Sequence, residues 1–148
     1  MFKTRRSVVI NRSPQDVFDY VTDPANDANW QGPAESSRWT SEGPPGVGST
    51  QQSVIKFLGR KLESTSEITT WDPPNTRGAK VIEGPIMPFQ GVFAFESTGE
   101  GGTELTVDFE GELGGFFKMA EGLVGKQLEK QFDTDLNALK LLLEGEQG

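Results

Sequence analysis

Apolar and polar residues alternate along most of the chain between residues 35 and 111. Turn-forming groups interrupt this alternation, such as Gly43-Pro44-Pro45-Gly46 and Asp72-Pro73-Pro74-Asn75. A period of two is typical of strands that bury one face, and such groups separate strands. Together with an apolar run at the N-terminus, the pattern predicts seven strands, near residues 2–11, 35–41, 47–58, 61–71, 76–83, 89–97 and 103–111.

Helical patterns occur on either side of this strand region. Ser13, followed by Pro14 and Asp16, is typical of a helix N-terminus and predicts a short helix that ends at Asp23-Pro24. A second short helix or turn is expected up to Trp30. Residues 115–143 predict one long helix, because their apolar residues recur every three or four positions. This apolar stripe consists of Phe117, Ala120, Val124, Leu128, Phe132, Leu136, Leu139 and Leu143.

The hairpin turns predict which strand residues face inward. A two-residue turn at Gly59-Arg60 pairs Phe57 with Leu62 and puts charged residues on the opposite face. The same reasoning gives the last hairpin an aromatic inner face and extends across the middle hairpins. The inner face is then expected to include Phe89, Gly91, Phe93, Phe95, Leu105, Val107, Phe109 and Gly111, with Arg77, Ala79, Val81 and Glu83 from the preceding strand.

Toward its middle, this inner face carries small polar residues. They are Ser53, Ser64, Ser66 and Thr70. A sheet packed tightly on a helix would carry branched apolar side chains there, so the small residues favour a cavity. The alternative is that the serines bond to the backbone and the glycines mark bulges.

Composition limits the chemistry. The 148 residues fit a single domain, 1–148. The chain has neither cysteine nor histidine, which excludes disulfides, Ser-His-Asp and Cys-His catalysis, and the commonest metal ligand. We expect no metal site and no cofactor. The net charge of −8 disfavours nucleic acid and anionic membranes as partners.

No stretch has the apolar length of a signal peptide or of a membrane helix. We therefore expect a cytoplasmic protein without stable membrane insertion, and the sequence leaves a homodimer open.

The order of elements resembles a known family. The residues that support this resemblance are INRSPQDVFDYVTD at 10–23, Trp30, Gly46-Val47-Gly48, Leu58-Gly59-Arg60, Trp71-Asp72-Pro73-Pro74 and the closing long helix. In this order they resemble the START-like or SRPBCC superfamily, in particular its polyketide cyclase/dehydrase and lipid-transport group. The resemblance implies an α+β helix-grip fold, in which a curved antiparallel sheet of seven strands surrounds the long helix and two short helices close one end.

The resemblance also implies an internal pocket for a hydrophobic or aromatic small molecule, but it does not imply one chemistry. We expect the chain to bind such a lipid- or polyketide-like ligand as a carrier or sensor. The expected lining consists of Trp39, Ile55, Phe57, Ser64, Ser66, Ile68, Phe93, Phe95, Phe109, Phe117 and Val124.

Two other functions stay open. The first is a cyclase or dehydratase without a metal or a nucleophilic triad. Its candidate catalytic residues are Glu83 and Arg77, since a carboxyl in an apolar pocket can act as an acid or base. The second is a protein-interaction module with a filled core. Separately from these alternatives, residues 86–89, Ile-Met-Pro-Phe, form an apolar loop that is expected to serve as a pocket lid or as a dimer contact.

Overall fold

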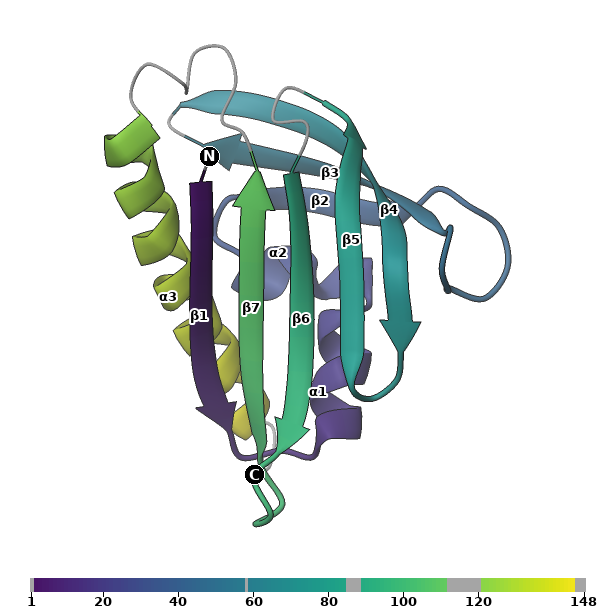
Figure 1. Cartoon of the computed structure of the whole chain (residues 1–148), viewed down its shortest axis with the longest axis vertical. Coiled ribbons are helices and arrows are strands. Elements are labelled where there is room, and N and C mark those ends of the chain that lie inside the picture. The colour runs from purple at the N-terminus through teal and green to yellow at the C-terminus, as the bar shows by residue number, and fades with distance from the viewer. Residues whose placement is uncertain (1, 58, 85–88, 112–120, 146–148) are drawn as a thin grey trace.

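The computed structural model describes residues 2–57, 59–84, 89–111 and 121–145. Its strands form one antiparallel sheet in the order β1-β7-β6-β5-β4-β3-β2, so β1 and β2 are the edges (Figure 1). All seven predicted strands are confirmed. They are β1 (Phe2–Ile10), β2 (Ala34–Trp39), β3 (Thr50–Phe57), β4 (Arg60–Asp72), β5 (Thr76–Glu83), β6 (Phe89–Ser97) and β7 (Thr103–Gly111).

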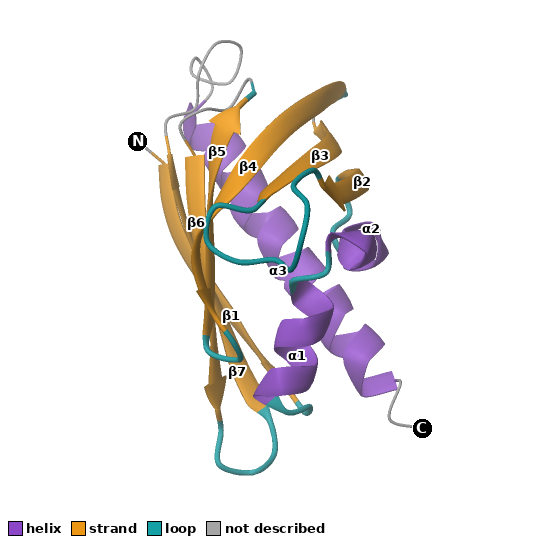
Figure 2. Ribbon diagram, turned by 90° about the vertical axis from the view of Figure 1, so that its right-hand side faces the viewer, coloured by secondary structure: helices purple, strands orange, loops and turns teal. Residues whose placement is uncertain are grey.

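The helices lie together on one side of the sheet, and the strands β2, β3 and β4 curve over them (Figure 2). They are α1 (Pro14–Val21), the single-turn η1 (Pro24–Asn26), α2 (Asp27–Trp30) and α3 (Glu121–Gly145). This is the predicted helix-grip architecture. The described part of the long helix extends two residues beyond the expected end at 143, and the expected start at 115 lies outside the described residues.

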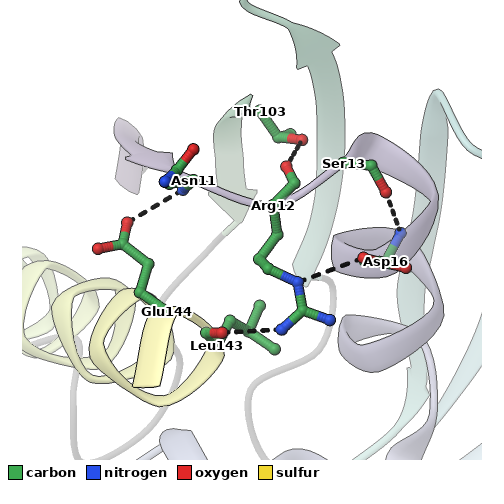
Figure 3. A network of polar contacts seen from close by, with 7 residues as sticks. All are labelled: Asn11, Arg12, Ser13, Asp16, Thr103, Leu143 and Glu144. Atoms are coloured by element: carbon green, nitrogen blue, oxygen red, sulfur yellow. Dashed lines mark hydrogen bonds and ion pairs between the residues drawn. The ribbon is translucent and has the colours of Figure 1, made fainter. Parts of the chain in front are cut away.

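The N-terminus of α1 forms as the sequence predicts. The backbone N–H of Asp16 donates to the Ser13 hydroxyl at 3.2 Å, and Pro14 occupies the first turn. Val17, Phe18 and Val21 then face the sheet and are buried. Polar residues of this connection also hold the end of α3 (Figure 3): Arg12 Nη1 donates to the Leu143 carbonyl at 2.9 Å.

The core has two parts. The larger cluster joins β1, α1, β6, β7 and the C-terminal half of α3, with Phe18, Phe95, Leu105 and Leu139 fully buried. The smaller cluster lies at the other end of the molecule and contains Phe2, Leu62 and Val124, with further half-buried residues around them. The space between the two clusters is where the sheet and α3 leave a cavity.

The hairpin between β3 and β4 differs from the expected register. Phe57 pairs with Arg60, and Ile55 pairs with Leu62, so the pairing is displaced by two residues. Because side chains alternate with a period of two, this displacement leaves every residue on its predicted face.

The expected inner-face position of Glu83 is wrong. On β5, Val81 pairs with Ser66, but Glu83 pairs with Thr65, so Ile82 is an extra residue in the ladder. This bulge turns Glu83 to the outer face, where it is exposed. Arg77 lies at the start of β5, before the bulge, and keeps its inward orientation.

Candidate ligand-binding cavity

A cavity of about 170 Å³ lies between the concave face of the sheet, α2 and α3. Its walls combine aromatic rings, small side chains and a few charged groups. The lining residues are Asp27, Trp30, Gln31, Gln51, Ser53, Ser66, Arg77, Ala79, Val81, Phe89, Gln90, Gly91, Phe93, Val107, Phe109, Phe132, Asp135 and Leu136.

Small residues keep the sheet side of this cavity open. Ser66 pairs with Gln51 across β3 and β4, and Ala79 pairs with Gly91 across β5 and β6. None of these except Gln51 projects more than two heavy atoms from the backbone. Larger side chains at the same positions would occupy the space between the sheet and α3.

Phenylalanine rings form the apolar wall. Phe109 stacks on Phe132 of α3, with ring centroids 4.6 Å apart and planes 10° apart. Phe93 meets Phe109 edge to face at 6.0 Å, and Phe89 lies 5.8 Å from Phe109 on another side. The stack of Phe109 and Phe132 therefore joins the sheet to the long helix at the edge of the cavity.

Arg77 brings a cation to this wall. Its guanidinium carbon lies 4.7 Å from the centroid of the Phe93 ring, a cation–π contact. Burial lowers the pKa of Arg77, and the carboxyl of Asp27 partly opposes that effect. The side chain is half-buried by surface area, because part of it borders the cavity. Among the described residues, no group accepts a hydrogen bond from it.

Asp27 is the first residue of α2 and is 7% exposed. Burial raises the pKa of its carboxyl to about 6, while the Ser37 hydroxyl and the Arg77 guanidinium lower it. Ser37 also hydrogen-bonds to Ser53 Oγ at 3.2 Å, so it links the Asp27 carboxyl to β3. Asp27 is thus a buried carboxyl that changes its charge close to neutral pH.

Asp135 contributes a second buried carboxyl from α3. Its Oδ1 atom accepts from the backbone N–H of Gly32 at 3.0 Å and from Gln131 Nε2 at 2.7 Å. Burial raises its pKa, and these two hydrogen bonds lower it. Asp135 therefore fixes the segment after α2 against the long helix while it borders the cavity.

The structure brings only part of the predicted lining to this cavity. Ser66, Phe93 and Phe109 border it, as does the candidate Arg77. The remaining predicted residues lie elsewhere: Phe95 and Ile68 are fully buried in the core, Ile55 and Val124 pack in the smaller cluster, Ser64 is half-buried on β4, and Trp39 packs edge to face on Trp71. The side chains of Phe57 and Phe117, and residues 86–88 of the expected lid, lie outside the described parts of the chain.

Sequence reasoning missed the two acidic residues of the cavity. Asp135 carried a readable signal, since it lies three residues after Phe132 and four before Leu139, within the apolar stripe of α3. A charged residue on a buried helix face is unusual and points to a paired or functional group. For Asp27, the signal was weaker, because a four-residue helix has no periodicity to read.

The described residues contain no group of three acidic side chains that could hold a metal ion. None of the helices in the described ranges combines the length and apolarity that crossing a bilayer requires.

Solved structures share this architecture over almost the full chain. TTHA0849 from Thermus thermophilus is 21% identical with a TM-score of 0.84, and the match covers 99% of both chains. The Zhui aromatase/cyclase from Streptomyces sp. R1128 is 19% identical with a TM-score of 0.78, covering 96% of this chain and 93% of that one. A START superfamily protein from Mycobacterium smegmatis is 15% identical with a TM-score of 0.75, covering 96% and 99%. At these identities, the likeness establishes the fold alone.

No curated protein matches the chain. The model of one family matches residues 1–144, and that family is described as polyketide cyclase / dehydrase and lipid transport. A match of this extent agrees with the order of elements and with the START-type neighbours. The chain therefore belongs to the polyketide cyclase / dehydrase and lipid transport family.

Proposed function

We propose that the chain binds a hydrophobic or aromatic small molecule in the cavity between the sheet and α3, as a carrier or sensor. The observation that carries this proposal is the composition of the cavity wall. Rings of Phe89, Phe93, Phe109 and Phe132 supply apolar surface, and a few buried polar groups converge beside them. A small number of placed polar groups in an apolar pocket is typical of small-molecule sites.

The size of the cavity limits what it holds. An engineered apolar cavity of roughly 150 Å³ binds benzene. At about 170 Å³, this cavity accommodates one substituted ring, and a longer molecule would extend past the lining. Burial of the ring drives binding, at roughly 25 cal/mol per Å² of apolar surface.

An enzyme of the cyclase or dehydratase type is the second candidate. It is favoured by the buried Asp27 carboxyl, whose pKa of about 6 suits proton transfer near neutral pH. Arg77 lies in the same cavity and would stabilise negative charge on a reacting oxygen. The carboxyl that supports this function is Asp27 rather than the predicted Glu83, which is exposed on the other face of the sheet.

The third function, an interaction module with a filled core, receives less support, because the described side chains leave the cavity unfilled. The cytoplasmic location and the homodimer stay predictions from sequence. Size-exclusion chromatography with light scattering tests the homodimer.

Native mass spectrometry of the purified chain, followed by organic extraction, tests the binding function. A co-purifying hydrophobic molecule is the expected result. The Ala79→Leu variant should lose it, because the larger side chain fills the cavity. Ala94→Leu is the matched control, since Ala94 lies on the other face of the neighbouring strand β6. Equal ligand retention by both variants would place the ligand elsewhere and contradict the proposal.

Once a ligand is known, Asp27→Asn separates the carrier from the enzyme. An enzyme that relies on the Asp27 carboxyl should lose turnover of the extracted compound and still bind it. A carrier should show no turnover in either form.

A further inference from the structure

We infer that the cavity selects a neutral aromatic molecule with a hydroxyl group, of the phenol class, and holds that hydroxyl between Arg77 and Asp27. This inference rests on the proposed binding function, and it names the chemical class of the ligand. Four observations lead to it: the unused donors of Arg77, the unused acceptors of Asp27, the charge around the cavity and the aromatic wall.

Arg77 requires a hydrogen-bond acceptor. A guanidinium carries five N–H donors and no acceptor. The Arg77 guanidinium lies over the Phe93 ring. Among the described residues, no acceptor forms a hydrogen bond with its N–H groups. These donors border the cavity, where water otherwise solvates them, so a ligand atom that replaces this water should accept a hydrogen bond from Arg77.

Asp27 requires a donor. Its ionised carboxylate only accepts hydrogen bonds and has about four acceptor positions, of which the Ser37 hydroxyl fills at most one. The side chain is more than nine-tenths buried and borders the same cavity as Arg77. A ligand group next to both residues must therefore accept from the guanidinium and donate to the carboxylate. A hydroxyl does both, whereas an ether or a ketone only accepts.

The charges of the cavity disfavour an ionised ligand. Its lining contains one cation, Arg77, and two carboxyls, Asp27 and Asp135. A carboxylate would meet two like charges in a region of low dielectric, and the chain as a whole carries −8. An ammonium group placed beside Arg77 would face another cation. A neutral hydroxyl avoids both repulsions and leaves the attraction between Asp27 and Arg77 intact.

The aromatic wall selects the rest of the molecule. Phe93 and Phe109 present an edge-to-face pair to the cavity, and the short side chain of Ala79 leaves flat space beside them. A planar ring fits between such surfaces and gains from offset or edge contacts with them. The volume of about 170 Å³ matches one ring with small substituents.

Five compounds of one ring size test this inference by isothermal titration calorimetry on the full chain at pH 7.5. They are 4-methylphenol, 4-methylanisole, toluene, benzylamine and benzoate. We expect 4-methylphenol to bind tightest, about tenfold or more above 4-methylanisole, because methylation removes the donor and leaves the ring. Benzoate and benzylamine should bind more weakly than toluene.

Variants test whether the preference for a hydroxyl depends on Asp27. Asp27→Ala should reduce the ratio between 4-methylphenol and 4-methylanisole to near one, and its circular dichroism spectrum and thermal unfolding show that the variant is folded. Asp19→Ala is the control, since Asp19 is an exposed carboxylate of α1. Its ratio should equal that of the wild type.

The outcomes separate the two proposals. If no compound binds, the proposed function fails, and the inference falls with it. If toluene or 4-methylanisole binds as tightly as 4-methylphenol, or an ionised compound binds tightest, the selection for a hydroxyl is overturned while the binding function stands. A ratio that persists in Asp27→Ala overturns the assigned position of the hydroxyl.

Discussion

Gly91 of β6 lies directly beneath the ring of Phe109 on β7. A Cβ atom on Gly91 would come within 2.5 Å of Phe109 Cε1, closer than non-bonded carbon atoms approach. The ring is held in this place from its other side by Phe132, at a centroid distance of 4.6 Å. The absence of a side chain at position 91 thus sets the position of the aromatic wall.

Gly91→Ala should therefore destabilise the protein and reduce the cavity. The added methyl group must push the Phe109 ring toward Phe132 or into the cavity, and overpacking of this kind costs about 1–3 kcal/mol. At roughly 2–4 °C per kcal/mol for a chain of this size, thermal unfolding should shift down by several degrees. Differential scanning calorimetry measures the shift.

Gly122→Ala is the matched control for this prediction. Gly122 lies in α3, and a Cβ there would meet no atom within 4 Å. Alanine is favoured over glycine in a helix, so this variant should be as stable as the wild type or more stable. A Gly91→Ala protein that unfolds no earlier than Gly122→Ala would contradict the described position of Phe109.

Asp27 predicts how stability depends on pH. Its pKa is about 6 in the folded chain and 3.8 as the ordinary value. Between these two values, the folded state holds a proton that the unfolded state has released, so this carboxyl makes stability fall as pH rises through the window. The loss is on the order of 2–3 kcal/mol and is complete above about pH 6.

Asp27→Asn, which stays neutral, should remove this fall. The variant should be more stable than the wild type at pH 7.5, with the difference shrinking toward pH 4. Urea unfolding at several pH values measures both proteins, and Asp19→Asn controls for the loss of an exposed carboxylate. A variant less stable than the wild type at pH 7.5 would mean that the attraction to Arg77 outweighs the cost of burial.

Asp135 should hold the segment after α2 in place. Asp135→Ala removes the acceptor of the Gly32 N–H and of Gln131, and an unpaired buried donor costs about 1–3 kcal/mol. Hydrogen exchange of the Gly32 amide should become faster. Asp135→Asn keeps an acceptor oxygen and should retain most of the protection. Equal exchange in the wild type and Asp135→Ala would show that this hydrogen bond does not hold the segment.

The sequence predicts faces better than it predicts exact pairs. Ile55 and Leu62 were expected on the inner face and lie there, although Phe57 pairs with Arg60 instead of Leu62, which shifts the pairing by two. The alternation of apolar and charged residues determines the face, and any even shift preserves it. The bulge at Ile82 is an odd shift, and it moves Glu83 to the opposite face. Nothing in the alternation of β5 marks that extra residue.

The charged part of the site depends on contacts that are distant in sequence. Asp27 and Arg77 are brought to one cavity by α2 and β5, and Gly32 meets Asp135 across 103 positions. Local patterns carry no information about such pairs, because the pKa of each carboxyl depends on burial by remote elements. The aromatic wall was easier to predict, since Phe93 and Phe109 follow the strand alternation directly.

Arg12 connects the C-terminal end of α3 to the start of α1 (Figure 3). Its guanidinium donates to the Leu143 carbonyl at 2.9 Å and pairs with Asp16 at 3.2 Å, while the Asn11 N–H donates to Glu144 at 3.0 Å. The last carbonyls of a helix lack partners within the helix, so a cation there satisfies one of them and interacts favourably with the helix dipole.

Arg12→Ala should therefore lower the free energy of unfolding by about 1–3 kcal/mol, most of it from the charged hydrogen bond to Leu143. Chemical unfolding followed by circular dichroism measures the loss. Arg5→Ala is the control, because it removes an exposed arginine that pairs with Asp108 across β1 and β7. Exposed pairs contribute little, so its effect should be clearly smaller. Equal losses in the two variants would show that the contact with the end of α3 adds nothing beyond a surface ion pair.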